Sequence, residues 1–254
     1  MAKRIVIYGL ETVPKIKPGD NLARIIVECA EREGVGIMDK DIIVVSSKIV
    51  SKSEGRIVSL RNVKTSKEAE KLSEKTGKDP KLLQLILDES KELVKVERGH
   101  IIVETRHGII CANAGIDRSN VAGREDVVVL LPIDPDGSAK LLKKSIMELT
   151  GKKVAVIITD TYGRPLREGQ VDMAIGLSGI TPFKDYRGKK DWMGYTLKVK
   201  KIALVDEIAA AAELVKGNGN EGIPVAIVRG LEYEEAEEAS AKELNMIREK
   251  WLFR

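Results

Sequence analysis

KKVAVIITD, residues 152–160, is the stretch that decides the fold. Its apolar run, Val154 to Ile158, is short and rich in β-branched side chains, which predicts a strand buried on both faces. DIIVVSS (41–47) has the same character. Helical patterns lie between such strands along the chain, and nothing repeats internally. The sequence therefore predicts a mixed α/β (α+β) architecture.

Hydrophobic periodicity predicts the remaining elements. The apolar residues that follow Asn21 recur at helical spacing, with Asp20 or Asn21 as the cap. Residues 64–97 are expected to form two helices broken at Gly77–Pro80. Further helices are expected over 138–151, 205–217 and, at the C-terminus, 234–252. Strands are expected over 3–8, 126–132, 195–204 and 224–230, with a hairpin over 100–115.

Composition excludes several classes of protein. The net charge of +4 is the small remainder of 43 basic and 39 acidic residues, and only 4% of residues are aromatic, so no nucleic-acid partner is expected. No apolar run reaches the roughly 18 residues of a membrane span, and the N-terminus does not resemble a signal peptide. With two cysteines in the chain, we expect a cytoplasmic protein. The length suits one domain, 1–254, with two closely associated subdomains whose boundaries the sequence leaves open.

Two aspartates follow apolar segments. Asp160 and Thr161 end the strand 152–160, where open α/β sheets present ligand-binding groups. Asp117 follows a second apolar stretch, in CANAGIDRSN (111–120). Each carboxylate alone either caps a turn or binds a cation. Together they favour a site for Mg²⁺ or Mn²⁺, which prefer oxygen ligands and often hold phosphates.

Other residues are suited to phosphates or carboxylates. Ser47, Lys48 and Lys52 follow the strand 41–47 and either bind phosphate oxygens or lie at a solvated strand end. Residues 217–222 spell a literal G-x-G-x-x-G, but it follows a helix and precedes a strand, so the dinucleotide-binding interpretation fails. It is either a flexible turn or a ligand loop. The arginines that could hold carboxylates, or form surface ion pairs, are Arg164, Arg167 and Arg187.

Seven ordered motifs span essentially the whole chain: VPKIKPGD (13–20), SSKIVSKSEGR (46–56), NAGIDRSN (113–120), ITDTYGRPLREGQ (158–170), AIGLSGITPFKDYRG (174–188), DEIAAAAELVKG (206–217) and IPVAIVRGL (223–231). Together they resemble the coenzyme F420-0:L-glutamate ligase (γ-glutamyl ligase) family. The resemblance implies a GTP-dependent ligase that adds L-glutamate through γ-linkages to coenzyme F420-0, a deazaflavin phosphodiester, giving F420-1 and F420-2. It also implies two divalent ions (Mg²⁺ or Mn²⁺), K⁺, and an intertwined homodimer.

The same resemblance assigns residues by motif. Asp117 and Asp160 resemble ligands of one metal, and Thr161 and Asn218 resemble ligands of the second. The expected catalytic residues are Asp117, Asp160 and Lys52. The positions that resemble nucleotide contacts are Val13, Pro14, Lys15, Ile16, Ser47, Lys48, Lys52, Asn120, Lys216, Gly217, Asn218, Gly219, Asn220, Glu221, Gly222 and Ile223.

The implied chemistry agrees with the residues. Joining a carboxylate to an amine in water requires activation, and phosphoryl transfer from GTP would give an acyl phosphate that the amine of glutamate attacks. Such a reaction needs charge neutralisation and positioning more than a covalent nucleophile. Two alternatives remain open: a γ-glutamyl ligase that acts on a folate-like or other pterin cofactor, and a nucleotide-binding protein without catalysis.

Overall fold

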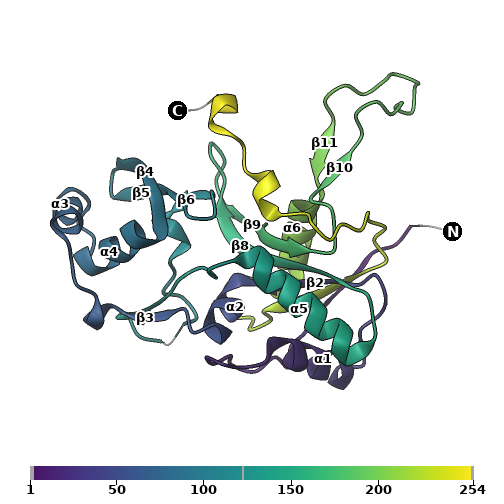
Figure 1. Ribbon diagram of the computed structural model, residues 1–254, viewed down its shortest axis with the longest axis horizontal. Coiled ribbons are helices and arrows are strands. Elements are labelled where there is room, and N and C mark those ends of the chain that lie inside the picture. Colours follow the sequence, from purple (N-terminus) through teal and green to yellow (C-terminus); the bar gives the residue numbers. More distant parts are fainter. Residues whose placement is uncertain (1–2, 122, 253–254) are drawn as a thin grey trace.

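The computed structural model describes residues 3–121 and 123–252, and a five-stranded sheet forms its centre (Figure 1). The strands lie in the order β1 (Val6–Gly9), β12 (Val225–Arg229), β2 (Ile42–Ser46), β8 (Ala155–Gly163) and β9 (Gln170–Ser178). The β2–β8 pair is parallel, and the other pairs are antiparallel. The two strands predicted from apolar runs are therefore neighbours at the middle of the sheet.

Helices cover both faces of this sheet. Helices α1 (Leu22–Arg32) and α5 (Pro135–Thr150) pack against Ile43 and Val45, whereas α6 (Leu204–Lys216) packs against Ile42 and Val44 on the other face. Because successive side chains of a strand point to opposite faces, β2 must be apolar throughout. The mixed α/β prediction is confirmed.

The predicted helix boundaries have local causes. The Asn21 side chain accepts a hydrogen bond from the backbone N–H of Arg24 at 3.0 Å and so caps α1. Helix α5 ends at Gly151, whose φ of 71° lies in the left-handed region that glycine adopts without strain.

A smaller part of the chain, residues 57–129, packs beside the central sheet (Figure 1). It contains the pair β3 (Ile57–Ser59) and β7 (Val127–Val129), and the sheet β4 (Ser90–Glu97), β5 (His100–Thr105) and β6 (Ile110–Ala112). Helices α3 (Lys67–Thr76) and α4 (Pro80–Glu89) cover it, and η1 (Leu60–Asn62) and η2 (Asn113–Gly115) are short 3₁₀ turns. The hairpin predicted over 100–115 is confirmed, while the division into two subdomains stays a prediction.

Three predicted elements differ from the structure. The second helix of 64–97 ends at Glu89, because residues 90–97 form β4 and pair with β5. The strand expected over 195–204 is reduced to β11 (Lys201–Ala203), which pairs with β10 (Phe183–Asp185). The terminal helix is wrong: residues 234–252 contain only the 3₁₀ turns η3 (Ala241–Leu244) and η4 (Arg248–Lys250). The structure adds β9 and the short helix α2 (Ser47–Ser53), which were not predicted.

Strand β9 lies at the edge of the central sheet, where unpaired N–H groups invite association with other strands. Carboxylates from flanking helices accept hydrogen bonds from these groups. Asp172 N donates to Glu213 Oε2 at 2.8 Å, and Ala174 N donates to the Asp206 carboxylate at 3.0 Å. Side-chain carboxylates, rather than another strand, thus accept hydrogen bonds from these backbone N–H groups of β9.

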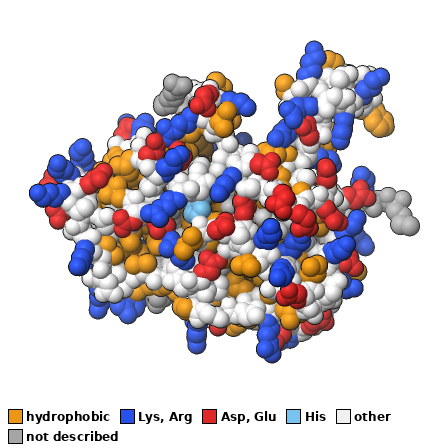
Figure 2. Space-filling view, in the orientation of Figure 1, with side chains coloured by type: hydrophobic (Ala, Val, Ile, Leu, Met, Phe, Trp, Pro, Cys, Tyr) orange, Lys and Arg blue, Asp and Glu red, His pale blue; other side chains and the backbone are white. Residues whose placement is uncertain are grey.

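Residues 183–203 form an arm that projects from the body of the molecule (Figure 1). It carries Lys and Arg together with exposed hydrophobic side chains (Figure 2). Trp192 is 99% exposed and Met193 87% exposed. No helix within the described ranges is long and apolar enough to cross a membrane.

Candidate functional site

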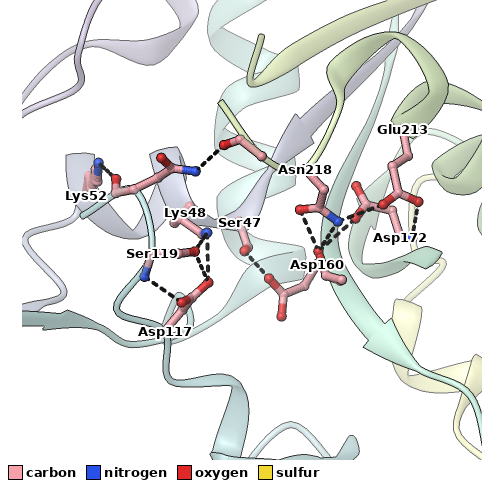
Figure 3. A network of polar contacts seen from close by, with 12 residues as sticks. Ser47, Lys48, Lys52, Asp117, Ser119, Asp160, Asp172, Glu213 and Asn218 are labelled. Carbon is pink, nitrogen blue, oxygen red and sulfur yellow. Dashed lines mark hydrogen bonds and ion pairs between the residues drawn. The ribbon is translucent and has the colours of Figure 1, made fainter. Parts of the chain in front are cut away.

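The carboxyl ends of β2 and β8 meet at one edge of the sheet. These strands run parallel, and their register ends with Ser46 opposite Thr159. The next residues, Ser47 and Asp160, are therefore close: Ser47 Oγ donates a hydrogen bond to Asp160 Oδ1 at 2.6 Å. Figure 3 shows Asp160 at the centre of a network of polar side chains.

Asp160 is a partly buried carboxylate that lies among other charges. Burial raises its pKa to about 6, the hydrogen bond from Ser47 acts in the opposite direction, and the charges of Asp172 and Asp117 raise the pKa further. The charges of Asp160 and Asp117 interact, so the two predicted metal ligands lie near each other. A cation between them would relieve this repulsion.

Asp117 is fixed by its own backbone. It forms an isolated antiparallel bridge with Val129, in which the two residues exchange N–H···O bonds of 3.1 and 2.9 Å. Its carboxylate pairs with Lys48 Nζ at 2.8 Å and accepts the Ser119 N–H at 2.7 Å. Burial raises the pKa of Asp117, but the Lys48 ammonium and the Ser119 hydrogen bonds outweigh it and hold the pKa below its ordinary value. Asp117 is thus ionised at neutral pH.

Lys52 connects α2 to two distant segments. Its Nζ donates to the Asn120 carbonyl at 2.6 Å, and Asn120 Nδ2 donates to the Gly219 carbonyl at 2.8 Å. Burial lowers the pKa of Lys52, and the charges of Lys48 and Lys15 lower it further. The structure therefore brings together four segments that the sequence assigned to one nucleotide: 13–16, 47–52, 120 and 216–223.

Within the segment 13–16, the side chains differ in accessibility. Ile16 is buried at 6% exposure in the core beside α1, and Val13 packs against the same core. Pro14 and Lys15 are exposed. A ligand beside this segment would thus meet backbone groups and the Lys15 side chain.

Thr161 points to the opposite face of β8 from Asp160, toward α6. Its Oγ1 donates to Asp172 Oδ1 at 3.2 Å. Asp172 Oδ2 in turn accepts from Lys216 Nζ at 2.6 Å, and the side chains of these two residues are only 7% and 1% exposed. Thr159 Oγ1 accepts from the same ammonium at 2.7 Å. The Lys216 side chain is therefore buried in an ion pair, away from the surface of the glycine-rich loop.

Asn218 contacts Thr161 through its side-chain amide. Asn218 Nδ2 donates to Thr161 Oγ1 at 2.8 Å and to Glu213 Oε1 at 2.7 Å. Thr161 and Asn218, assigned by resemblance to one metal, thus lie in contact. Asp172 and Glu213 were missed from the sequence, where the signals were an acid inside an otherwise apolar strand and an acid within an Ala-rich helix.

The glycine-rich loop folds around its own carboxylate. Gly217 has a φ of 64°, and a Cβ there would lie 2.2 Å from Glu221 Cδ, so only glycine fits. The Gly219 N–H donates to Glu221 Oε2 at 2.8 Å. Asn220 and Gly222 are exposed, and Ile223 is partly buried at the start of the return to β12.

The three arginines do not converge on this cluster. Arg187 lies in the arm, where its Nε donates to Asp185 Oδ2 at 2.9 Å. Arg164 donates to the Glu168 carbonyl at 2.6 Å within the connection between β8 and β9. Arg167 lies exposed in that same connection.

The donor chemistry fits Mg²⁺ or Mn²⁺. Carboxylate, hydroxyl and amide oxygens are hard ligands, and proteins commonly hold Mg²⁺ with one or two carboxylates together with substrate phosphates. No group of three or more His, Cys, Asp or Glu suited to a metal occurs in residues 3–121 and 123–252. Asp117 with Asp160, and Thr161 with Asn218, would each need phosphate or water oxygens to complete a coordination shell.

Fold and site together define a class: a mixed α/β enzyme scaffold with paired carboxylates, lysines and a glycine-rich loop at the carboxyl edge of a sheet. A family model described as F420-0:Gamma-glutamyl ligase matches residues 11–230. The chain is 46% identical over 226 residues to "Coenzyme F420:L-glutamate ligase" of Methanothermobacter thermautotrophicus, covering 89% of each chain. It is 46% identical over 230 residues to the protein of that name from Methanocaldococcus jannaschii, covering 90% of this chain and 88% of the other. The chain belongs to the F420-0:gamma-glutamyl ligase family and is a ligase.

Proposed function

We propose that this protein is a GTP-dependent ligase that adds L-glutamate through γ-linkages to coenzyme F420-0, giving F420-1 and F420-2. Membership of the ligase family and the names of the relatives support the acceptor and the amino acid. One observation carries the nucleotide dependence: on α2, Lys48 pairs with Asp117 and Lys52 reaches the glycine-rich loop through Asn120. Such an arrangement of cations, carboxylates and loop amides suits a triphosphate with its counter-ions.

The reaction divides into two steps. A carboxylate oxygen of the acceptor attacks the γ-phosphorus of GTP, the bond to the β-phosphate oxygen breaks, and GDP leaves. The amine of glutamate then attacks the acyl carbon, loses a proton and expels inorganic phosphate. Both steps require like-charged reactants to approach, so positive groups must be positioned in advance.

The residues would divide this work. Lys48 and Lys52 would hold phosphate oxygens. Asp117 and Asp160 would hold one divalent ion, and Thr161 with Asn218 the second. The bound Mg²⁺ or Mn²⁺ would supply neutralisation of phosphate charge. We also propose K⁺ as a further cofactor.

A mass-detected acceptor assay tests the function. The protein is incubated with Mn²⁺, K⁺, L-glutamate, GTP and either F420-0 or a pterin acceptor, and ATP replaces GTP in a parallel reaction. We expect mass gains in glutamate steps on F420-0 with GTP. Gains on the pterin alone would replace the acceptor, and phosphate release that does not require glutamate and acceptor would refute the ligase. Asp117→Ala should abolish turnover, and full activity of that variant would contradict the metal assignment.

We further propose a cytoplasmic homodimer. The exposed hydrophobic side chains of the arm, Trp192, Met193 and Val199, are unusual for a free surface and suit burial against a second copy. Light scattering coupled to size exclusion should give twice the mass of the chain. A monomer at micromolar concentration with GTP present would contradict the dimer.

A further inference from the structure

A cavity of about 380 Å³ lies beside the edge strand β9. Its walls come from β8 and β9, from α6, from residues 108–110 and from the C-terminal segment 244–251. This volume falls within the range of small-molecule sites. Figure 2 shows hydrophobic side chains gathered at the base of the C-terminal segment.

The cavity walls are apolar and aromatic. Tyr162, Met173, Met246 and Trp251 line it, and the Tyr162 hydroxyl is held by the Ile110 carbonyl. Aromatic and thioether side chains form favourable contacts with flat ring systems. The walls therefore suit a planar aromatic group.

The charges of the cavity exclude the other parts of the substrates. No Lys or Arg lines it in the part of the chain that the structure describes, and its charged groups are the carboxylates Asp172 and Asp206. A triphosphate or the carboxylates of glutamate would be repelled there. Asp206 accepts the Ala174 N–H through one oxygen, and burial raises the pKa of its carboxyl group. The cavity is thus unsuited to the multiply anionic parts of the substrates, and the Asp206 carboxyl group could share a hydrogen bond with an occupant.

The cavity adjoins the candidate site. Tyr162 directly follows Thr161 on β8, and Asp172 both lines the cavity and accepts the hydrogen bond from Thr161. A substrate with its rings in the cavity would therefore extend its remaining part toward the edge where Asp160 and Asp117 lie.

The C-terminal wall is held in place by contacts with the smaller part of the chain. Arg248 donates to Glu104 Oε2 at 2.8 Å, and Trp251 Nε1 donates to the Met246 carbonyl at 2.9 Å. Arg248 also lies 5.3 Å from the Trp251 ring centroid. Met246, Arg248 and Trp251 lie beyond the range 11–230 that the family model matches.

We propose that this cavity binds the planar ring system of the acceptor, with Trp251 and Tyr162 as its aromatic walls. The proposal rests on the proposed function, because that function supplies an acceptor with a tricyclic deazaflavin ring. It assigns to the C-terminal segment a role in acceptor binding that is separate from the nucleotide.

Binding is tested first, without catalysis. The chain has two tryptophans, Trp192 on the arm and Trp251 at the cavity, so Trp192→Phe and Trp251→Phe each leave a single reporter. Both proteins are titrated with the deazaflavin chromophore that lacks the phosphodiester. We expect saturable quenching of Trp251 emission and much weaker quenching of Trp192 emission. Equal quenching of both, or none, would overturn the proposal.

Kinetics provide the second test. Trp251→Ala should raise the KM for F420-0 about tenfold, since loss of one stacking partner and its buried area is worth that much, and should change the KM for GTP less than twofold. Met246→Ala, at a 62% exposed position, is a milder variant for which misfolding is no concern. Met38→Ala, at a 52% exposed position outside the cavity, is the matched control. Product formation with an unchanged acceptor KM in both cavity variants would overturn the ring site and leave the ligase standing. Saturable Trp251 quenching without any glutamyl product would support the ring site and refute the ligase.

Discussion

Lys216→Met tests the buried ion pair beneath Thr161. The Lys216 ammonium lies 2.6 Å from Asp172 Oδ2 and 2.7 Å from Thr159 Oγ1, with side-chain exposures of 1% for Lys216 and 7% for Asp172. Methionine keeps most of the volume, so little packing is lost. The Asp172 charge, however, stays buried without its partner, and such a change costs about 3–5 kcal/mol of unfolding free energy. We expect a loss within that range.

Urea unfolding followed by far-ultraviolet circular dichroism measures this loss. Lys216→Met, Asp172→Asn and the double variant complete a thermodynamic cycle. Because the double variant contains no unpaired buried charge, it should be less destabilised than the sum of the single variants by about 2 kcal/mol or more. A loss below about 1 kcal/mol for Lys216→Met, with additive single variants, would refute the reasoning.

Four further outcomes follow from the structure. Asp160→Asn should raise the unfolding free energy of the metal-free protein at pH 8 by about 2 kcal/mol, because it removes a buried charge repelled by Asp172. The pKa of Asp160 is raised to about 6, so the metal-free wild type should gain stability relative to Asp160→Asn as the pH falls from 6 toward 4. Glu213→Ala leaves the N–H of Asp172 without its acceptor and removes one of the two acceptors of the Asn218 amide, so it should cost about 1–2 kcal/mol in urea unfolding, with Glu213→Gln closer to wild type. Burial and the Asp160 charge raise the pKa of Cys111 to about 12, so iodoacetamide should label this thiol at pH 8 only in unfolding concentrations of urea, as mass spectrometry would detect; rapid labelling of the folded protein would contradict this.

The central sheet could be predicted because its signals are local. An uninterrupted apolar run such as 154–158 specifies burial on both faces by itself. Elements held by long-range contacts could not be predicted. Residues 90–97 continue a helical pattern yet pair with β5, and the charged segment 234–252 is held instead by contacts such as Arg248 with Glu104. Tertiary pairing overrides local propensity in both places.

Part of the candidate site could be predicted from the sequence for the same reason. Asp117 and Asp160 stand out because each follows an apolar segment. Asp172 does not stand out, because its role depends on an ion pair with Lys216, which is 44 residues away, and on burial that only the packed structure creates. The glycine-rich loop had the wrong order of elements for the familiar motif, and its link to Lys52 through Asn120 required the fold.

The candidate site places like charges close together, which by itself makes folding less favourable. Asp160 is buried near two other carboxylates, which raises its pKa, while Lys52 lies near Lys48 and Lys15, which contributes to lowering its own. Elsewhere in the same network, Lys216 and Asp172 form a complete buried pair. Asp117 and Lys48 already pair with each other. The groups whose pKa values are shifted against their charged forms are Asp160 and Lys52, and these are the ones that would gain most from a bound cation and a bound anion. Binding of a phosphate with its counter-ion would satisfy both groups at once, and the free energy of that relief would be available only when the two ligands are present together.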